Sequence, residues 1–209
     1  MSIPSTKSVG TTKVRIKDEF WDKKIQLIVD KVIPYQWKAL NDEIPGAPAS
    51  HAVENLRIAA GKSTGTFHGM PFQDSDVAKW LEAASNSLIQ FPNAELERSI
   101  DELIDLIGEA QQENGYLNTF FSVEKPDQQW SDFSHGHELY CAGHFIEAAV
   151  AYYTATGKRK LLDVMCRFMD YVDTIIGPEE HKRKVYCGHE EIELALFKLY
   201  KTTENEKYF

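Results

Sequence analysis

The sequence predicts an all-α protein built from helical hairpins. Apolar residues recur at helical spacing through most of the chain, and capping residues, glycines and prolines separate the runs. Strand-like alternation is minimal. The 209 residues, 43% of them hydrophobic, are enough to build a core. Residues 1–13 are small and polar and predict a flexible N-terminal tail, so we expect the folded domain over 14–209.

The first predicted elements surround a proline. Residues 14–21 alternate briefly between polar and apolar side chains, which suggests a short strand. Apolar residues then follow helical spacing over 20–41, and Pro34 should kink or divide this helix. A loop rich in proline and glycine, 43–50, leads to a short helix over 51–61.

The middle of the chain predicts the first clear hairpin. A helix is expected over 76–90, with Asp74 or Ser75 as its cap. Asn93 should cap its partner over 94–112, which carries a single apolar stripe formed by Leu96, Ile100, Leu103, Ile104 and Ile107.

The hairpin pattern then recurs. A helix over 137–157 pairs with one over 158–177, and a helix over 188–203 begins the next pair. Residues 204–209 start a further helix, so Tyr208 and Phe209 finish the sequence where an apolar stripe should begin. Because terminal repeats of helical stacks normally carry a polar cap, we expect this chain to be a fragment of a longer protein.

Composition limits the partners. The chain has 32 acidic and 23 basic residues, a net charge of −9, which disfavours nucleic-acid binding but not a neutral ligand such as a sugar. Three cysteines are a poor disulfide framework and fit a reducing compartment. The sequence shows neither a signal peptide nor an apolar run long enough for a membrane span. We therefore expect a cytoplasmic protein without nucleic-acid or membrane partners.

Two histidines occupy matching places in successive hairpins. His137 and His189 each stand within Gly-His-Glu at the start of a helix. In a ring of hairpins, corresponding helix ends converge on one side, so the two imidazoles should meet at one mouth as a polar ligand site. Either histidine taken alone is more readily explained as a helix-cap residue that bonds the backbone.

A third histidine lies close to His137 in the sequence. His137, Cys141 and His144 follow helical spacing, so they would share one face and could bind zinc. The alternative is that Cys141 is a small buried apolar residue. We favour that alternative because free cysteine is among the most buried residue types.

The loop 67–76 supplies a second set of polar groups, which consists of His68, Gln73, Asp74 and Asp76. These side chains either form a hydrogen-bonding rim of a site, or two of them, Asp74 and Asp76, simply cap the next helix. Trp80, Tyr116 and Trp130 could offer faces for sugar stacking, although aromatic residues at such positions are more often part of the core.

The chain also resembles a known enzyme family, glycoside hydrolase family 127, whose named activity is that of a β-L-arabinofuranosidase. The match runs in order from about residue 14 to the end of the sequence. It is carried by FW at 20–21, VIPYQWKALNDEI at 32–44, SHAVENLRIAAG at 50–61, FHGMPFQDSDVAKWLEAA at 67–84, AQQENGYLNT at 110–119, GHELYCAGHFIEAAVAYYTATGKRKLLDV at 136–164 and GHEEIELALFKLY at 188–200.

The resemblance implies an (α/α)6 barrel catalytic domain, an incomplete toroid of which this chain forms roughly the first half. It further implies that His137 and His189 contact the sugar, and that His68, Gln73 and Asp74 lie beside the pocket. Enzymes of this family hydrolyse glycosides with retention of the anomeric configuration, using a cysteine nucleophile near a zinc ion and a glutamate acid/base. Those residues belong to a motif downstream of the matched region, so the resemblance assigns this chain no catalytic residue, metal or cofactor. The loop 43–50 is shorter than the family's usual insert, which contributes to the sugar pocket.

Two functions follow from these observations. The first is part of a retaining glycoside hydrolase that acts on terminal β-L-arabinofuranosides or related sugars, in which this chain binds sugar but is inactive alone. The second is a self-contained helical-repeat module that binds a partner protein. An unsealed apolar edge also predicts self-association.

Overall fold

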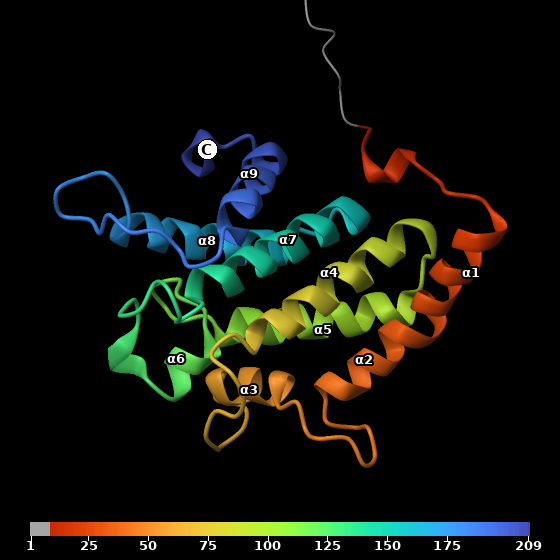
Figure 1. Ribbon diagram of the computed structural model, residues 1–209, viewed down its shortest axis with the longest axis horizontal. Coiled ribbons are helices and arrows are strands. Elements are labelled where there is room, and N and C mark those ends of the chain that lie inside the picture. Colours follow the sequence, from red (N-terminus) through yellow and green to blue (C-terminus); the bar gives the residue numbers. More distant parts are fainter. Residues whose placement is uncertain (1–8) are drawn as a thin grey trace, which may run out of the picture.

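The computed structural model describes residues 9–209, and these fold into helices joined by loops (Figure 1). Residues 1–8 of the predicted tail lie outside the described residues, and Thr11–Lys13 forms one turn of 3-10 helix. No strand is found between residues 9 and 209. The short strand expected over 14–21 is wrong, because Asp18 caps a helix there by accepting from the backbone N–H groups of Phe20 at 2.9 Å and Trp21 at 2.7 Å.

The first long helix is divided near its proline, as predicted. Helix α1 (Glu19–Leu27) continues into a π-helical segment (Ile28–Val32) and then into α2 (Ile33–Leu40). Pro34 is the second residue of α2. Proline has no backbone N–H, so the regular α-helical hydrogen-bond pattern cannot continue through Pro34. The wider π turn just before Pro34 shifts the hydrogen-bond register at this point.

The predicted hairpin helices are present over the rest of the chain. They are α3 (Ala52–Ala59), α4 (Asp74–Gln90), α5 (Ala94–Ala110), α7 (Glu138–Thr156), α8 (Lys160–Ile175) and α9 (Glu191–Thr203). Two short segments, α6 (Thr119–Val123) and a 3-10 turn (Pro126–Gln128), lie between α5 and α7. The helix expected over 204–209 is only a 3-10 turn, Glu206–Tyr208.

The hairpins stack in two layers. Helices α4, α7 and α9 pack side by side, α5 and α8 pack behind α4 and α7, and α2 lies beside α4 (Figure 1). Asn93 caps α5 as predicted, accepting from Glu95 N at 3.0 Å and Leu96 N at 3.1 Å. The apolar stripe of α5 faces the core, where Ile100, Leu103, Ile104 and Ile107 are buried and Leu96 is partly buried.

The three aromatic residues considered as stacking faces belong to the core. Trp80, Tyr116 and Trp130 are 3%, 0% and 4% exposed, and the indole N–H of Trp80 donates to the carbonyl of Ile33 at 3.0 Å. They therefore stabilise the helix layers and offer no open face to a ligand.

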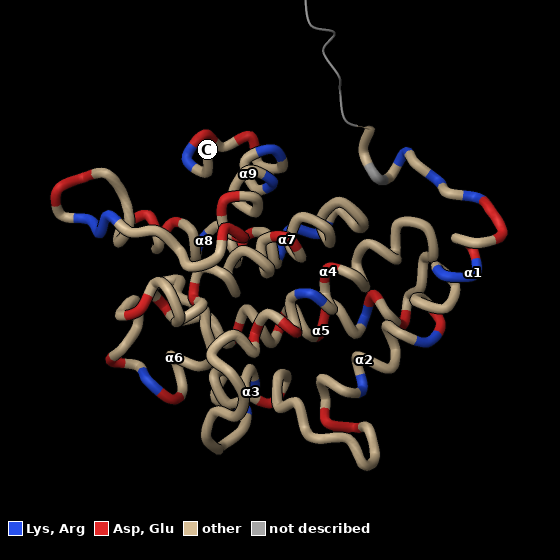
Figure 2. Tube along the Cα trace, in the orientation of Figure 1, with Lys and Arg blue, Asp and Glu red and all other residues tan. Residues whose placement is uncertain are grey.

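The outer surface carries most of the charge. Figure 2 marks the acidic and basic positions along the trace. Acidic side chains of α5 pair with lysines at the start of α8, where Lys158 contacts Glu97 and Asp101, and Lys160 contacts Asp105. These pairs are exposed, so each contributes little to stability. Among the described residues, no helix is long and apolar enough to cross a membrane.

Candidate functional site

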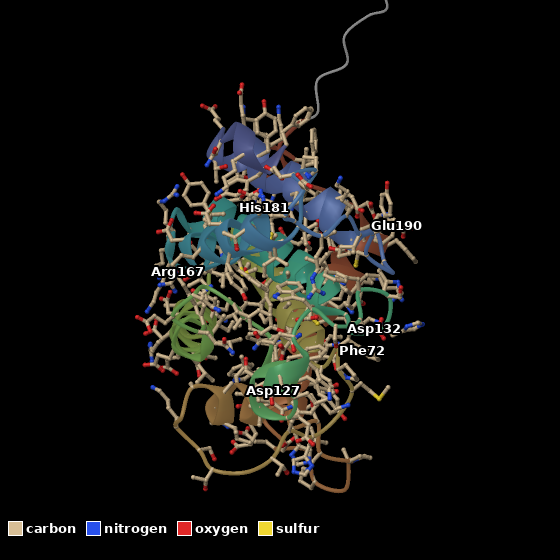
Figure 3. The ribbon with its side chains drawn as sticks, turned by 90° about the vertical axis from the view of Figure 1, so that its left-hand side faces the viewer. Phe72, Asp127, Asp132, Arg167, His181 and Glu190 are labelled. Carbon is tan, nitrogen blue, oxygen red and sulfur yellow. The ribbon has the colours of Figure 1, made fainter. Side chains whose placement is uncertain are left out.

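The starts of α4, α7 and α9 lie at one end of the molecule. The imidazoles of His137 and His189 meet just before α7 and α9 begin, while further along these helices Glu147 of α7 pairs with Lys198 of α9 at 2.7 Å. The helices are therefore parallel. Figure 3 shows one labelled residue from each preceding loop, Phe72, Asp132 and Glu190, along the same side of the molecule.

The two histidines form a hydrogen-bonded pair. Their Nε2 atoms are 3.1 Å apart and their ring centroids 5.0 Å apart, so the imidazoles meet at one mouth as the recurrence predicted. The Nδ1 atom of His137 lies 2.5 Å from the carbonyl oxygen of His135. Because a carbonyl only accepts, Nδ1 of His137 is the donor in this contact, so in the hydrogen bond of the pair Nε2 of His137 accepts from the Nε2–H of His189.

Close loop packing brings the pair together. The backbone N–H of Gly188 donates to the carbonyl of Phe133 at 3.0 Å. A Cβ on Gly188 would stand 2.1 Å from the carbonyl oxygen of Ser134, so only glycine fits at this contact. The Asp132 carboxylate organises the facing loop, because its Oδ1 accepts from the backbone N–H of Ser134 at 3.0 Å and of His135 at 2.9 Å.

A tyrosine and a lysine complete the contacts around the pair. The Tyr140 ring lies 5.6 Å from the His137 ring and 5.1 Å from the His189 ring, measured between centroids. Its hydroxyl accepts from Lys79 Nζ at 2.7 Å, and the same ammonium donates to Ser75 Oγ at 3.2 Å. Sequence reasoning missed both residues, although Tyr140 follows His137 by one helical turn.

Three carboxylates, one each from α4, α7 and α9, act on one another: Glu82, Glu147 and Glu191. Half-buried His144 lies with Nδ1 3.5 Å from Glu191 Oε1, and burial lowers the pKa of His144 to about 4, so its ring is neutral. Burial, followed by the charges of Glu147 and Glu82, raises the pKa of Glu191. The acidic side chains of this cluster are therefore protonated or paired more readily than a carboxylate in water.

His68 and Gln73 stand in the loop before α4. The backbone of His68 exchanges hydrogen bonds with the Asn55 side chain, and its ring lies 4.6 Å from that of His51. Gln73 Nε2 donates to Asp76 Oδ2 at 3.1 Å and contacts Ser50 Oγ at 3.5 Å. No contact joins either residue to the histidine pair. The nearest ring from this loop is that of Phe72, 5.0 Å from His137.

Asp74 is buried beneath this surface rather than placed on its rim. It is 2% exposed, and its two oxygens accept from the Thr119 backbone N–H at 2.8 Å and hydroxyl at 2.5 Å. Burial raises the pKa of Asp74 to about 6. The capping prediction for Asp74 and Ser75 is wrong, because α4 begins at Asp74 and Gln73 precedes it without a side-chain cap.

Glu138 takes the equivalent place at the start of α7. It accepts from the Tyr116 hydroxyl at 2.5 Å and from the Trp130 backbone N–H at 2.9 Å. Burial raises the pKa of this carboxyl to about 7. Asp74 and Glu138 thus anchor the segments that cover the starts of their helices.

His137, Cys141 and His144 do not form the zinc site considered as an alternative. His137 precedes α7 in a left-handed conformation, with φ of 59°, so it does not share the helical face of Cys141 and His144. Cys141 is fully buried, and burial raises the pKa of its thiol, as expected for a core residue. Within residues 9–209, no three His, Cys, Asp or Glu side chains are arranged to hold a metal ion. No site for the zinc ion that the resemblance implies is therefore found among these residues.

Comparison with known proteins decides the family. Residues 13–209 match the family model described as β-L-arabinofuranosidase, glycoside hydrolase family 127 catalytic domain. The chain belongs to this family. A curated non-reducing end β-L-arabinofuranosidase from Bifidobacterium longum subsp. longum is 45% identical over an alignment of 213 positions, which covers 93% of this chain and 32% of the relative.

Solved structures of family 127 share the fold. A β-L-arabinofuranosidase from Geobacillus stearothermophilus T6 is 56% identical with a TM-score of 0.92, covering 94% of this chain and 31% of that one. A second β-arabinofuranosidase is 34% identical with a TM-score of 0.85, covering 95% and 32%. The predicted fold class, helical hairpins forming part of an (α/α)6 barrel, is confirmed. The chain spans about a third of the length of these relatives.

Proposed function

We propose that this family 127 chain forms a sugar-binding wall of a retaining glycosidase whose whole protein hydrolyses terminal β-L-arabinofuranosides or related sugars. The observation that carries the proposal is the histidine pair, in which His137 and His189 meet with Nε2 atoms 3.1 Å apart at the starts of neighbouring helices. The pair stands in a mouth formed by three loops, the kind of place where small polar ligands bind.

The chemistry of the pair suits a sugar hydroxyl. With Nδ1 of His137 donating to the carbonyl of His135, Nε2 of His137 is an acceptor and Nε2 of His189 is a donor. A hydroxyl both donates and accepts, so it can enter between the rings, donating to His137 and accepting from His189. The ring of Tyr140 lies beside both imidazoles, so the face of a sugar formed by its C–H groups can pack against it.

The remaining predicted residues do not touch the histidine pair, and we assign them smaller roles. Gln73 reaches the same loop surface and offers its amide to an outlying hydroxyl, and exposed His68 is a second such group. Because both oxygens of Asp74 are occupied by Thr119, we assign Asp74 the role of positioning the start of α4. No residue of this chain is assigned to bond breaking. The cysteine, glutamate and zinc implied by the family would come from elsewhere in the whole protein.

A titration of imidazole signals tests the proposal. L-arabinose added to the 209-residue chain should shift the ¹⁵N signals of His137 and His189, and His137→Ala or His189→Ala should weaken binding at least tenfold. His181→Ala is the matched control, because His181 is exposed in a loop away from the mouth (Figure 3). Unshifted signals of the pair at saturating sugar would refute the proposal.

Catalysis has its own test. The isolated chain should not hydrolyse a chromogenic β-L-arabinofuranoside, because the proposed role supplies binding without a nucleophile or an acid/base. Release of chromophore above the level seen with heat-unfolded chain would show that the proposed role, sugar binding without catalysis, is wrong.

A specific observation favours partner binding as a second function. Large apolar side chains are exposed along α1 and the helix that continues it, among them Phe20, Trp21, Leu27 and Tyr35, which are 51% to 61% exposed. Such a row is typical of a surface that associates, including with a second copy. Light scattering at rising protein concentration should detect self-association, and Trp21→Ser with Leu27→Ser should reduce it.

A further inference from the structure

The backbone of Trp130 is held in a conformation that a bulky residue rarely adopts. Its φ angle is 59°, in the left-handed region, while its side chain is buried against the rings of Tyr116 and Phe133. Within residues 9–209 the indole N–H finds no hydrogen-bond partner, so the polar contacts that hold this residue are those of its backbone. Strain of this kind persists only where the surroundings enforce it, and it concentrates at functional sites.

Two charged side chains bind the backbone of Trp130 from opposite sides. The carboxylate of Glu138 accepts from the Trp130 N–H, with Oε2 at 2.9 Å and Oε1 at 3.1 Å. The Nη1 atom of Arg183 donates to the Trp130 carbonyl at 2.5 Å, and its Cζ lies 5.7 Å from the centroid of the Phe133 ring. Hydrogen bonds to charged groups are stronger than those between neutral groups. Together they hold Trp130 in its left-handed conformation.

Arg183 is itself fixed to the end of α8. Its backbone N–H donates to the carbonyl of Ile175 at 2.8 Å, and its carbonyl accepts from the N–H of Gly177 at 3.2 Å. Residues 177–183 therefore form a turn that is closed at its base by the last residues of α8. Because this base is held, the bond from Arg183 to Trp130 ties the end of α8 to the segment that leads into α7.

The two loops that carry the histidine pair are cross-linked at two points. Arg183 joins Trp130, and further along both loops the Gly188 N–H donates to the carbonyl of Phe133 at 3.0 Å. A single cross-link would leave the loops free to rotate about it, whereas two fix both their separation and their relative angle. The imidazoles follow directly after the second link, so the first link controls the angle at which they meet.

We propose that Arg183 is a positioning residue for the histidine pair and acts through the backbone of Trp130. Its guanidinium holds the loop of His189 against the loop of His137, and Glu138 holds the opposite side of Trp130. The consequence for sugar binding rests on the proposed function, because it takes the pair to be the sugar contact. The positioning itself concerns the geometry of the pair.

Three variants of the 209-residue chain test the proposal. Arg183→Met removes the donors and keeps a stem of similar length, and Arg183→Lys returns a positive charge that can reach the same carbonyl. Lys184→Met is the matched control, because Lys184 is the next residue, carries the same charge and is exposed, as Arg183 is. The first measurement is the ¹⁵N–¹⁵N coupling across the hydrogen bond of the histidine pair, and the second is a titration with L-arabinose.

Arg183→Met should abolish the coupling and weaken L-arabinose binding about tenfold, the factor that corresponds to one charge-assisted hydrogen bond. Arg183→Lys should restore the coupling and most of the affinity, and Lys184→Met should change neither. A native coupling in Arg183→Met, an equal loss in Lys184→Met, or no coupling in the native chain would overturn the proposal. A lost coupling with native affinity would support the positioning and refute the pair as the sugar contact.

The carboxyl of Glu138 gives a readout that a general loss of stability would not move. Burial raises its pKa to about 7, while the hydrogen bonds from Tyr116 and Trp130 and the charge of Arg183 lower it. Arg183→Met should therefore raise this pKa further, as followed by ¹³C NMR, and Lys184→Met should leave it unchanged. An unchanged pKa in Arg183→Met would overturn the placement of Arg183 opposite Glu138. If the native chain shows the coupling but binds no L-arabinose, the proposed function fails, and the coupling still decides the positioning.

Discussion

Gly188 offers the sharpest test of how the histidine pair is assembled. Its N–H donates to the carbonyl of Phe133 at 3.0 Å, and a Cβ added to it would lie 2.1 Å from the carbonyl oxygen of Ser134. Both partners are backbone atoms, so no side chain can rotate away. In Gly188→Ala, the loop that carries His189 must therefore move away from the loop that carries His137.

The size of the effect follows from the same contacts. Clearing the oxygen requires a displacement of about 1 Å, and adding that to the 3.1 Å separation of the Nε2 atoms takes it beyond hydrogen-bond range. Loss of the Gly188 backbone hydrogen bond costs about 1 kcal/mol, and residual crowding adds a similar amount. We expect the free energy of unfolding to fall by about 2 kcal/mol, and the affinity for L-arabinose to fall at least tenfold.

Urea unfolding and the sugar titration measure the two effects. Gly108→Ala is the control, because a Cβ at Gly108 meets only Val164 Cγ2 at an ordinary 3.7 Å within α5. It should raise stability by about 0.5–1 kcal/mol and leave sugar binding unchanged. A Gly188→Ala chain with coupled His137 and His189 signals and native affinity would refute this account of the pair.

Three further outcomes test buried or capping groups. Because the pKa of Asp74 is raised to about 6, its protonated form contributes stability that is present below about pH 4 and is lost as the pH rises to about 6. Asp74→Asn should remove up to about 3 kcal/mol of that pH dependence, as measured by urea unfolding at pH 4 and pH 8. Asn93→Ala should lower the free energy of unfolding by about 1 kcal/mol, and an unchanged urea midpoint would contradict the capping role. Cys141 should be the last cysteine to react with a thiol reagent, since Cys166 and Cys187 are only partly buried; mass spectrometry of partially labelled chain would expose an earlier reaction.

Helical periodicity and the matching histidines were sufficient to predict much of this molecule. The stripe on α5 follows from local spacing, and Asn93 acts on its own neighbours, so both could be identified in the sequence. His137 and His189 were predicted to meet because equivalent positions of parallel hairpin helices lie at the same end. Each of these predictions depends on local spacing or on repetition.

Contacts between distant segments could not be predicted in this way. Asp74 was expected at a surface because its partner, Thr119, belongs to a segment far along the chain. The bond between Lys79 and Tyr140 depends on how far α4 and α7 are displaced along each other, which no single helix specifies. The alternative of a zinc-binding face, which the sequence left less favoured than a buried Cys141, is wrong for a local reason, since His137 adopts a left-handed conformation and α7 starts only after it.

The three loops of the mouth each precede a helix of the same layer, and this arrangement separates recognition from folding. The layer is held by buried side chains such as Leu81, Phe145 and Leu199, whereas the mouth is built from residues outside the helices, such as His137 and His189. Insertions, deletions or exchanges in one of these loops can therefore change the surface around the histidine pair while the scaffold keeps its architecture, and an engineer can graft a new loop at the same junctions.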